Sequence, residues 1–279
     1  MLDINIRRPA MNFLSDHKVK EELKEMLSWL STFLGEHEIN YTIMSGTMLG
    51  AVRHSGFIPW DDDIDIGLLR NDYENLIHIA KNFEDSKYKF EGFEVEGFGR
   101  PFLKFVNKEI AVETDNEVDH YLWVDIFPFD GVPNHFSGIY QFYFHKIIRN
   151  IRNTKNEVAF EKGLANQSSK IKRLYNRFLR FITQRYSEND INRLIIKQAK
   201  ERKVDKCDYI EDITWGNKKF PKRCMEKLVD YEFENITVKG MKDYDTYLKS
   251  IYGDYMKLPP EAERVNHGIK AWRVEENEK

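Results

Sequence analysis

Hydrophobic positions at helical spacing form the first clear pattern in the chain, within residues 17–37. They recur every three or four residues, and they are Val19, Leu23, Met26, Leu27, Leu30, Phe33 and Leu34. This spacing predicts an amphipathic helix that begins near Asp16. The apolar run 41–44 then predicts a short buried strand, and the segment 47–54 predicts a short helix.

Alternation of polar and apolar residues follows in the segment 63–69, DIDIGLL, and predicts a half-buried strand. A second helix is expected over about 71–83. Further strands are predicted within 87–97, 100–107, 109–114 and 120–133. The C-terminal third mixes short strands and helices. This order predicts an α/β (α+β) fold, with a mixed sheet flanked by helices.

The segment from about 137 to 203 has a helical pattern and is strongly basic. Residues 141–204 hold 16 Lys or Arg and 5 Asp or Glu, so their net charge is +11 and that of the rest is −14. We therefore expect a core over 1–135, a basic helical insert over 136–205, and a C-terminal part over 206–279. The asymmetry indicates an anionic partner for the insert.

Composition narrows the class of protein. Hydrophobic residues make up 41% of the 279 residues, which is ample for a packed core. The chain has a mean hydropathy of −0.61, and no apolar run approaches the roughly 18 to 20 residues of a membrane span. The N-terminus lacks the apolar region of a secretory signal. Cys207 and Cys224 are the only cysteines, so we expect a reduced, cytoplasmic protein without structural zinc.

Four aspartates lie within residues 61–65 and need positive charge nearby. On a strand, Asp63 and Asp65 project to one face and the intervening isoleucine to the other. Paired carboxylates on a strand face suit Mg²⁺ or Mn²⁺ rather than Zn²⁺. Asp125 is flanked by apolar residues and is the candidate third ligand.

Two other interpretations of the acidic cluster fit the sequence less well. Clustered acidic residues most often lie in a solvated loop. Apolar residues alternate with the acids of this cluster, which disfavours that interpretation. In a calcium-binding loop, Asp61, Asp63 and Asp65 would fit the first, third and fifth positions. Ile66 then stands where glycine is needed and Asp72 where glutamate is needed, which disfavours this interpretation.

The segment 45–54, SGTMLGAVRH, places small residues at a predicted strand-to-helix turn. Gly46 would let the backbone approach a phosphate, and the amides from Thr47 onward would open the helix. Arg53 and His54 would add positive charge. A phosphate-binding turn beside a metal site is the minimum required for phosphoryl or nucleotidyl transfer.

Three segments resemble the signature blocks of LicD-family phosphotransferases: 45–67, 123–133 and 252–260. The family is similar to the nucleotidyltransferase superfamily. Its bacterial members transfer phosphocholine from CDP-choline to sugars of teichoic acid or lipooligosaccharide, and distant animal relatives transfer alditol phosphates. The resemblance implies a nucleotidyltransferase-like catalytic core over 1–135, with an active site completed by 206–279.

By this resemblance, Asp63, Asp65 and Asp125 would be catalytic residues and ligands of Mg²⁺ or Mn²⁺. Gly46 and Thr47 would form the phosphate-binding turn. The 15 residues between Thr47 and Asp63 exceed the generic nucleotidyltransferase spacing, although they suit the LicD block. Other expected substrate-binding residues are Arg53, His54, Lys104, Trp60, Trp123, Tyr252, Lys257, Arg264 and His267, the tryptophans as aromatic faces for choline. Lys104 would hold a phosphate; the alternative is that its side chain points to solvent.

The implied reaction is attack of a sugar hydroxyl on the phosphorus of a CDP-alcohol, with release of CMP. Asp125 or Asp62 would take the hydroxyl proton, and Asp125 is preferred. The alternatives are transfer of glycerol or ribitol phosphate, nucleotidyl transfer, and a membrane scaffold that binds nucleotide or metal without catalysis.

The basic insert has two interpretations. Its charges form a solvated face, or they dock on an anionic membrane or on a lipid-linked glycan acceptor, as Phe178, Phe181 and Ile182 beside many arginines suggest. The second interpretation adds peripheral contact with the inner face of the cell membrane. No nucleic acid partner is expected, because no RNA-binding module accompanies the charge.

Overall fold

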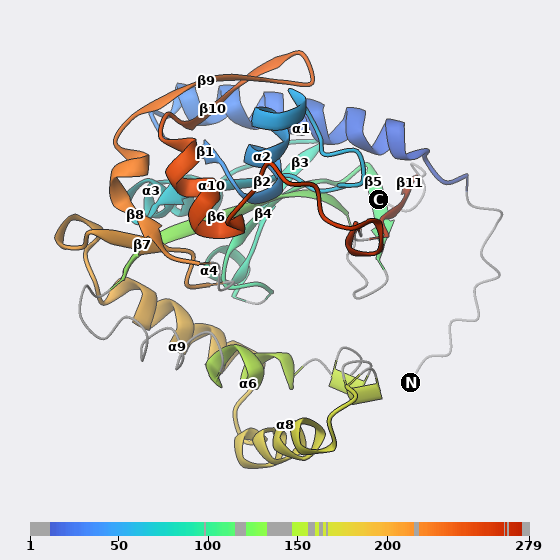
Figure 1. The fold of residues 1–279 in the computed structure, drawn as a ribbon, viewed down its shortest axis with the longest axis vertical. Helices are drawn as coiled ribbons and strands as arrows, with labels where there is room; N and C mark the ends of the chain where they lie inside the picture. The colour runs from blue at the N-terminus through green and yellow to red at the C-terminus, as the bar shows by residue number, and fades with distance from the viewer. Residues whose placement is uncertain are drawn as a thin grey trace.

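The computed structural model describes residues 12–97, 99–114, 121–132, 147–155, 160–161, 164–165, 167–214, 218–264, 266 and 268–274. The N-terminal half contains α1 (Asp16–Glu36), β1 (Thr42–Ile43), α2 (Ser45–His54), β2 (Asp65–Leu69), α3 (Arg70–Ala80), β3 (Tyr88–Glu91), α4 (Phe93–Glu96), β4 (Leu103–Asn107), β5 (Ile110–Glu113) and β6 (Leu122–Val132). The rest contains α6 (Arg149–Asn153), α8 (Lys170–Thr183), α9 (Glu188–Lys200), η2 (Val204–Lys206), β7 (Tyr209–Glu211), β8 (Phe220–Pro221), η3 (Lys222–Met225), β9 (Leu228–Phe233), β10 (Ile236–Met241), α10 (Tyr244–Tyr252), η4 (Glu261–Glu263) and β11 (Lys270–Arg273) (Figure 1).

The first predicted helix is confirmed as α1. Its cap is Ser15, whose hydroxyl accepts a hydrogen bond from the Lys18 amide, so that the orphan donors of the first turn have a partner. The predicted apolar face of α1 is buried at Leu23, Leu27 and Leu30. The segments predicted as strand 41–44, helix 47–54 and strand 63–69 correspond to β1, α2 and β2.

A mixed sheet forms the centre of the molecule, with the strand order β1-β2-β6-β4-β3. Strands β2 and β6 are parallel, whereas β1, β4 and β3 pair antiparallel to their neighbours. The end of β6 pairs with β7, and β7 pairs with β8. The predicted fold class, a mixed sheet flanked by helices, is therefore confirmed.

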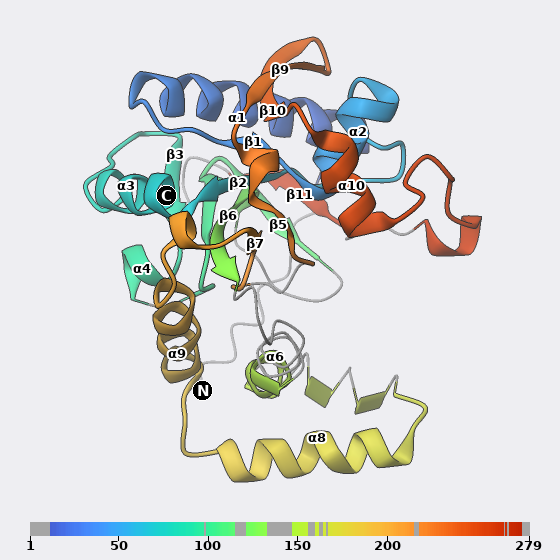
Figure 2. The same ribbon diagram turned by 60° about the vertical axis from the view of Figure 1, so that its left-hand side comes forward.

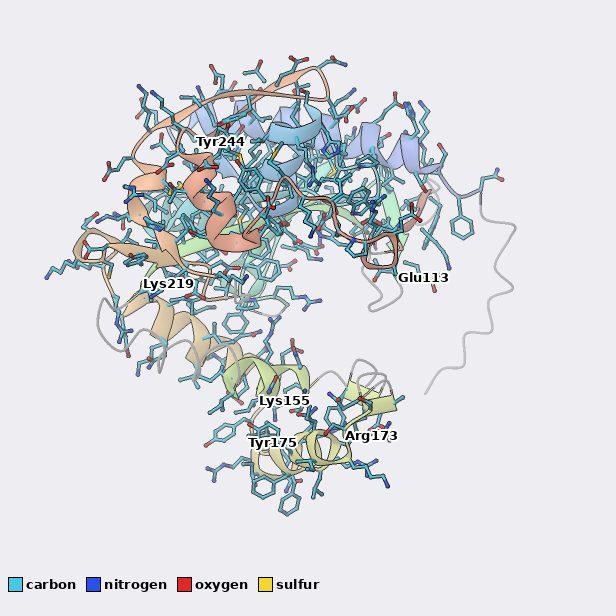
Figure 3. The ribbon with its side chains drawn as sticks, viewed as in Figure 1. Glu113, Lys155, Arg173, Tyr175, Lys219 and Tyr244 are labelled. Atoms are coloured by element: carbon cyan, nitrogen blue, oxygen red, sulfur yellow. The ribbon has the colours of Figure 1, made fainter. Side chains whose placement is uncertain are left out.

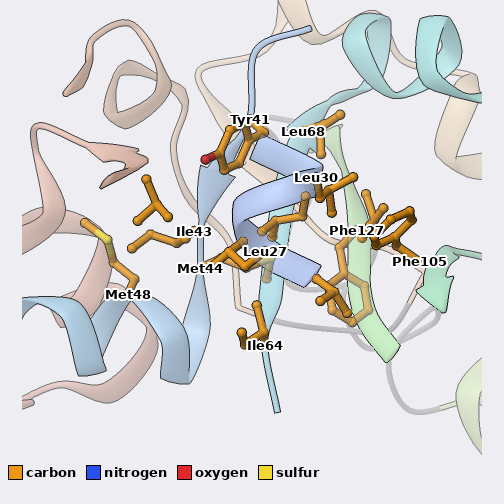
Figure 4. Close-up of a cluster of buried hydrophobic side chains, with 14 of the residues drawn as sticks. Leu27, Leu30, Tyr41, Ile43, Met44, Met48, Ile64, Leu68, Phe105 and Phe127 are labelled. Carbon is orange, nitrogen blue, oxygen red and sulfur yellow. The ribbon is translucent and has the colours of Figure 1, made fainter. Parts of the chain in front are cut away.

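The two faces of this sheet differ around Asp65 and Asp125. Across β2, β6 and β4, the residues Ile66, Ile126 and Leu103 stand in register, and side chains in register share a face. The same face carries Phe105, which stacks on Trp29 of α1 with 5.1 Å between ring centroids. Figure 4 shows Leu27 and Leu30 of α1 among the apolar residues of these strands. Helix α1 therefore covers an apolar face, and the opposite face carries Asp65, Asp125 and Lys104 beside buried aromatic residues of β6.

The predicted strand within 87–97 is only partly correct. Strand β3 ends at Glu91, and the following Phe93–Glu96 is the short helix α4. Gly92 has φ 150° and Gly97 has φ 79°, conformations that only glycine adopts easily. These two glycines stop the strand and then the helix, although the alternating sequence between them favours a strand.

The basic helical pattern is confirmed in α6, α8 and α9. Helix α9 connects the insert to the sheet domain: Asn192 donates a hydrogen bond to the Gly99 carbonyl at 2.8 Å, and Lys200 pairs with Glu74 at 2.8 Å. Helix α6 lies between α8 and the rest of the molecule in both views (Figures 1 and 2). No helix among the described residues is long and apolar enough to span a membrane.

Candidate active site

A pocket of ≈ 410 Å³ opens beside the start of β2. Three parts of the chain line it: α2, the loop that leads to β2, and the segment after α10. The lining residues are Ser45, Gly46, Leu49, Arg53, Ile58, Trp60, Asp61, Asp63, Asp65, Tyr252, Asp254, Tyr255, Lys257 and Pro259. The first and third signature segments therefore meet here, although about 200 residues separate them along the chain.

Helix α2 is held in place by contacts at its first turn. The Ser45 amide donates to the Tyr247 hydroxyl at 2.9 Å, and Ser45 has a positive φ of 48°. The Asp65 amide donates to the Thr47 hydroxyl at 2.9 Å. Thr47 is buried and joins α2 to β2, whereas Gly46 lines the pocket. Of the predicted phosphate-binding turn, only Gly46 is therefore open to a ligand in this conformation.

Gly46 allows the helix turn to approach the acidic loop closely. A Cβ atom at this position would lie 2.5 Å from Oδ2 of Asp61. Any larger residue would push the Asp61 carboxylate out of its present position. The glycine thus sets the distance between α2 and the acidic cluster.

The carboxylates around β2 are crowded. Ile64 and Ile66 are fully buried, and Asp63 and Asp65 line the pocket, so the predicted alternation is confirmed. Burial raises the pKa of Asp65 well above its usual value, and the charges of Asp63 and then Asp125 raise it further. A cation bound between these groups would relieve the repulsion. The oxygen donor set fits Mg²⁺ or Mn²⁺ in chemical type.

The carboxylates do not form a complete metal centre in this conformation. Among the residues that the structure describes, no group of three or more His, Cys, Asp or Glu side chains is arranged to hold a metal ion. Metal ligation by Asp63, Asp65 and Asp125 therefore remains a prediction.

Asp125 lies next to Asp65 in the sheet, although it does not line the pocket. The two residues are register partners on the parallel strands β2 and β6, and Lys104 on β4 is the register partner of Asp125. The indole N–H of Trp123 donates to Oδ2 of Asp125 at 3.1 Å. The Lys104 ammonium lies 3.8 Å from the centroid of the Trp123 ring. Because Lys104 is only 8% exposed, the solvent-facing alternative for this lysine is wrong.

Of the two predicted arginines, Arg53 lines the pocket and Arg264 does not. The Arg53 guanidinium donates to the Tyr255 carbonyl at 2.9 Å and so joins α2 to the C-terminal segment. Arg264 lies 4.9 Å from the Trp60 ring centroid and covers that ring. His54 is exposed and does not line the pocket. Its pKa is lowered by partial burial and by the adjacent charge of Arg53.

Tyr252 and Lys257 line the pocket, as predicted for the last segment. Tyr252 is 44% exposed. Burial first, and then Tyr247 and Asp65, raise the pKa of Tyr252, so the hydroxyl stays protonated and can donate a hydrogen bond. His267, another predicted residue, lies outside the described residues.

Several residues at the site escaped the sequence prediction. Tyr247 supports Ser45, and the Glu234 carboxylate accepts a hydrogen bond from the Phe57 amide at 3.0 Å. Glu234 stands in the two-residue turn between β9 and β10 with φ 48°. Asp212 adds negative charge near Asp65. Asp62 accepts from the Ile269 amide at 3.3 Å and does not line the pocket.

The fold and the pocket agree with the nucleotidyltransferase-like class, and a family model matches part of the chain. Residues 38–152 match the family model LicD/FKTN/FKRP, nucleotidyltransferase domain. This part of the chain, which contains the first two signature segments, is therefore similar to the LicD family.

Three relatives illustrate the range of similarity. The chain is 28% identical over 252 residues to the lipopolysaccharide cholinephosphotransferase LicD of Haemophilus influenzae, which covers 88% of this chain and 92% of the relative. It is 40% identical over 84 residues to an uncharacterized protein of Rickettsia prowazekii, which covers 27% of this chain and 32% of the relative. It is 30% identical over 107 residues to the human ribitol 5-phosphate transferase FKRP, which covers 38% and 20%, respectively.

Proposed function

We propose that this protein transfers phosphocholine from CDP-choline to a sugar hydroxyl of a lipooligosaccharide or teichoic acid precursor. The observation that carries the proposal is the pocket, in which Asp63 and Asp65 of the first signature segment face Tyr252 and Lys257 of the third. The similarity to a lipopolysaccharide cholinephosphotransferase over 88% of the chain supports the same activity.

The acidic cluster requires a cation if it is to receive an anionic donor. Asp63, Asp65 and Asp125 would hold Mg²⁺ or Mn²⁺, which when bound would neutralise charge on the donor phosphates. Arg53 and Lys257 line the same pocket and would bind phosphate oxygens by charge-assisted hydrogen bonds. The protonated hydroxyl of Tyr252 would donate a further hydrogen bond.

The choline group needs an aromatic face that no other cation occupies. Trp123 carries the Lys104 ammonium on its ring, and Trp60 carries Arg264. A quaternary ammonium would be repelled from both of these faces. Tyr252 lines the pocket and is partly exposed, so we propose Tyr252 as the principal aromatic contact of choline.

Asp125 is the preferred acceptor of the proton from the sugar hydroxyl. The Trp123 indole N–H holds one of its oxygens, which would orient the carboxylate. Asp62 is the weaker candidate because its carboxylate accepts a hydrogen bond from the Ile269 amide, whereas Asp125 is the register partner of Asp65. The proton would pass to Asp125 as the hydroxyl oxygen bonds to phosphorus and CMP leaves.

The test is a panel of CDP-choline, CDP-glycerol and CDP-ribitol, assayed with Mg²⁺ and saccharide acceptors, with CMP release as the readout. CDP-choline should give CMP and a phosphocholine-modified acceptor. Absence of CMP with every donor, when a competent acceptor is present, contradicts the proposal. Pyrophosphate release from a nucleoside triphosphate would instead indicate nucleotidyl transfer.

Ribitol phosphate transfer is the second candidate, supported by the match to a ribitol 5-phosphate transferase over 38% of the chain. The Tyr252→Leu variant separates the two. If Tyr252 contacts choline, this change should weaken use of CDP-choline more than use of CDP-ribitol. Binding of nucleotide without turnover of any donor would favour the scaffold interpretation.

A further inference from the structure

Helix α8 presents a continuous apolar stripe to solvent. The stripe follows the spacing of one helix face, and all six of its side chains are exposed: Ile171, Leu174, Tyr175, Phe178, Phe181 and Ile182. Ile171 is 82% exposed and Phe181 is 67% exposed. Isolated apolar residues on a surface are ordinary, whereas six on one helix face mark an interaction surface.

A second stripe on α8 is basic. Lys170, Arg173, Arg177 and Arg180 follow helical spacing beside the apolar stripe, and α8 contains no acidic residue. Within the described part of the chain, neither Lys172 nor Arg177 forms an ion pair. Figure 3 labels Arg173 and Tyr175 on α8.

The opposite side of α8 is held firmly. Leu179 and Thr183 are buried, and the Lys155 ammonium donates to the Thr183 carbonyl. Of the basic stripe, Arg180 is also engaged within the chain, because its guanidinium lies 4.7 Å from the Phe160 ring centroid and pairs with Glu161. Because one side of the helix is packed, the exposed stripe is a fixed surface at the edge of the molecule (Figure 2).

We propose that α8 lies in the plane of an anionic membrane surface, with its apolar stripe inserted among the lipids. Basic side chains beside an apolar stripe match the negative headgroups above an apolar interior. A second copy of the chain fits less well, because two α8 helices would bring like charges together. This surface is separate from the pocket, and its occupant does not depend on the reaction.

The test is co-sedimentation of the full chain with vesicles of phosphatidylcholine alone or with phosphatidylglycerol added. Binding should require the anionic lipid and weaken with salt. The Lys170→Gln, Arg177→Gln variant should bind roughly 25-fold more weakly, at roughly fivefold per charge. Its matched control, Lys197→Gln with Lys242→Gln, removes two exposed charges elsewhere and should bind within about twofold of the original chain.

The double variant Phe178→Ser, Phe181→Ser tests the apolar stripe. Its control is Leu194→Ser, which changes an exposed apolar residue of α9. The α8 variant should lose binding while its circular dichroism stays unchanged, and the control should keep it. Equal binding to neutral vesicles, or full binding by both α8 variants, overturns the proposal. So does an α8-dependent dimer without vesicle binding. The Asp65→Asn variant should still bind vesicles, so failure of the proposed reaction leaves this result unaffected.

Discussion

Helices α1 and α8 are both amphipathic, yet their apolar faces meet different surroundings. The apolar face of α1 is buried against the sheet, with Leu23, Leu27 and Leu30 fully inaccessible. The corresponding face of α8 keeps Leu174 and Phe178 exposed. The two parts of the molecule also differ in charge. Aspartates crowd beside β2 of the sheet that α1 covers, whereas the charged residues of α8 are all basic. Periodicity thus identifies an apolar face, and the surrounding charge indicates what that face is suited to meet.

The largest expected effect is at the contact between α3 and β6, beside α9. Arg70 makes two 2.7 Å hydrogen bonds to the buried Asp130, and Glu74 beside it pairs with Lys200 of α9. Arg70→Leu would leave the Asp130 charge buried without its partner and should cost about 3–5 kcal/mol of unfolding free energy. Urea denaturation measures this. The control Lys200→Leu, at a partly exposed pair, should cost less than about 1 kcal/mol. Equal losses would contradict the account.

The next largest expected effect is on the rate of the transfer reaction. Asp65→Asn should lower the transfer rate by roughly 10² to 10³, the usual loss for a group that stabilises charge at a reacting centre. The control Asp230→Asn, at an exposed pair with Lys239, should leave the rate within about twofold because such pairs contribute little. Initial rates of CMP release measure both. A fully active Asp65→Asn enzyme would show that the pocket is not the catalytic site.

Leucine deletions compare the two helices directly. Leu30→Ala should lower the unfolding free energy by about 3 kcal/mol, because it removes fully buried methyl groups. Leu174→Ala should change it by less than about 0.5 kcal/mol, because the side chain is exposed. Thermal and urea unfolding measure the pair. A large loss for Leu174→Ala would mean that something in the chain covers α8.

The smallest effect is the pH dependence of stability that Asp65 contributes. Its pKa is raised in the fold, so between its ordinary value of 3.8 and the raised value the unfolded state releases the proton first. The contribution of Asp65 to the unfolding free energy is therefore complete below pH 3.8, and it decreases as the pH rises through that window. Asp65→Asn should remove this part of the slope and be slightly more stable at neutral pH. An unchanged slope in urea titrations without divalent cations would contradict the crowding of charge at Asp65.

Local patterns predicted much of the fold. The alternation of burial over residues 63–66 was correct, because each isoleucine gains burial on one side and each aspartate keeps access to the pocket on the other, although the strand itself begins only at Asp65. The segment Phe93–Glu96 failed because backbone constraints at Gly92 and Gly97 outweigh an alternating sequence.

Contacts between distant parts of the chain explain the residues that were missed. Tyr247 contacts Ser45 across 202 positions and Glu234 contacts Phe57 across 177. Neither contact leaves a local signal in the sequence. Conversely, Thr47 fits the phosphate-binding turn by its residue type, yet its hydroxyl is used to join α2 to β2. The position of Lys104 also depends on a contact between distant parts of the chain, because only the register of the sheet brings it beside Asp125.

The central claim is that the pocket beside β2 binds a CDP-alcohol together with a divalent cation. Isothermal titration of CDP-choline into the full chain tests it most directly, with Mg²⁺ or with EDTA, and without any acceptor. We expect binding with Mg²⁺, much weaker binding with EDTA, and none to the Asp63→Asn, Asp65→Asn variant, while Asp230→Asn binds normally. Binding that ignores Mg²⁺ and survives the loss of both aspartates would contradict the account.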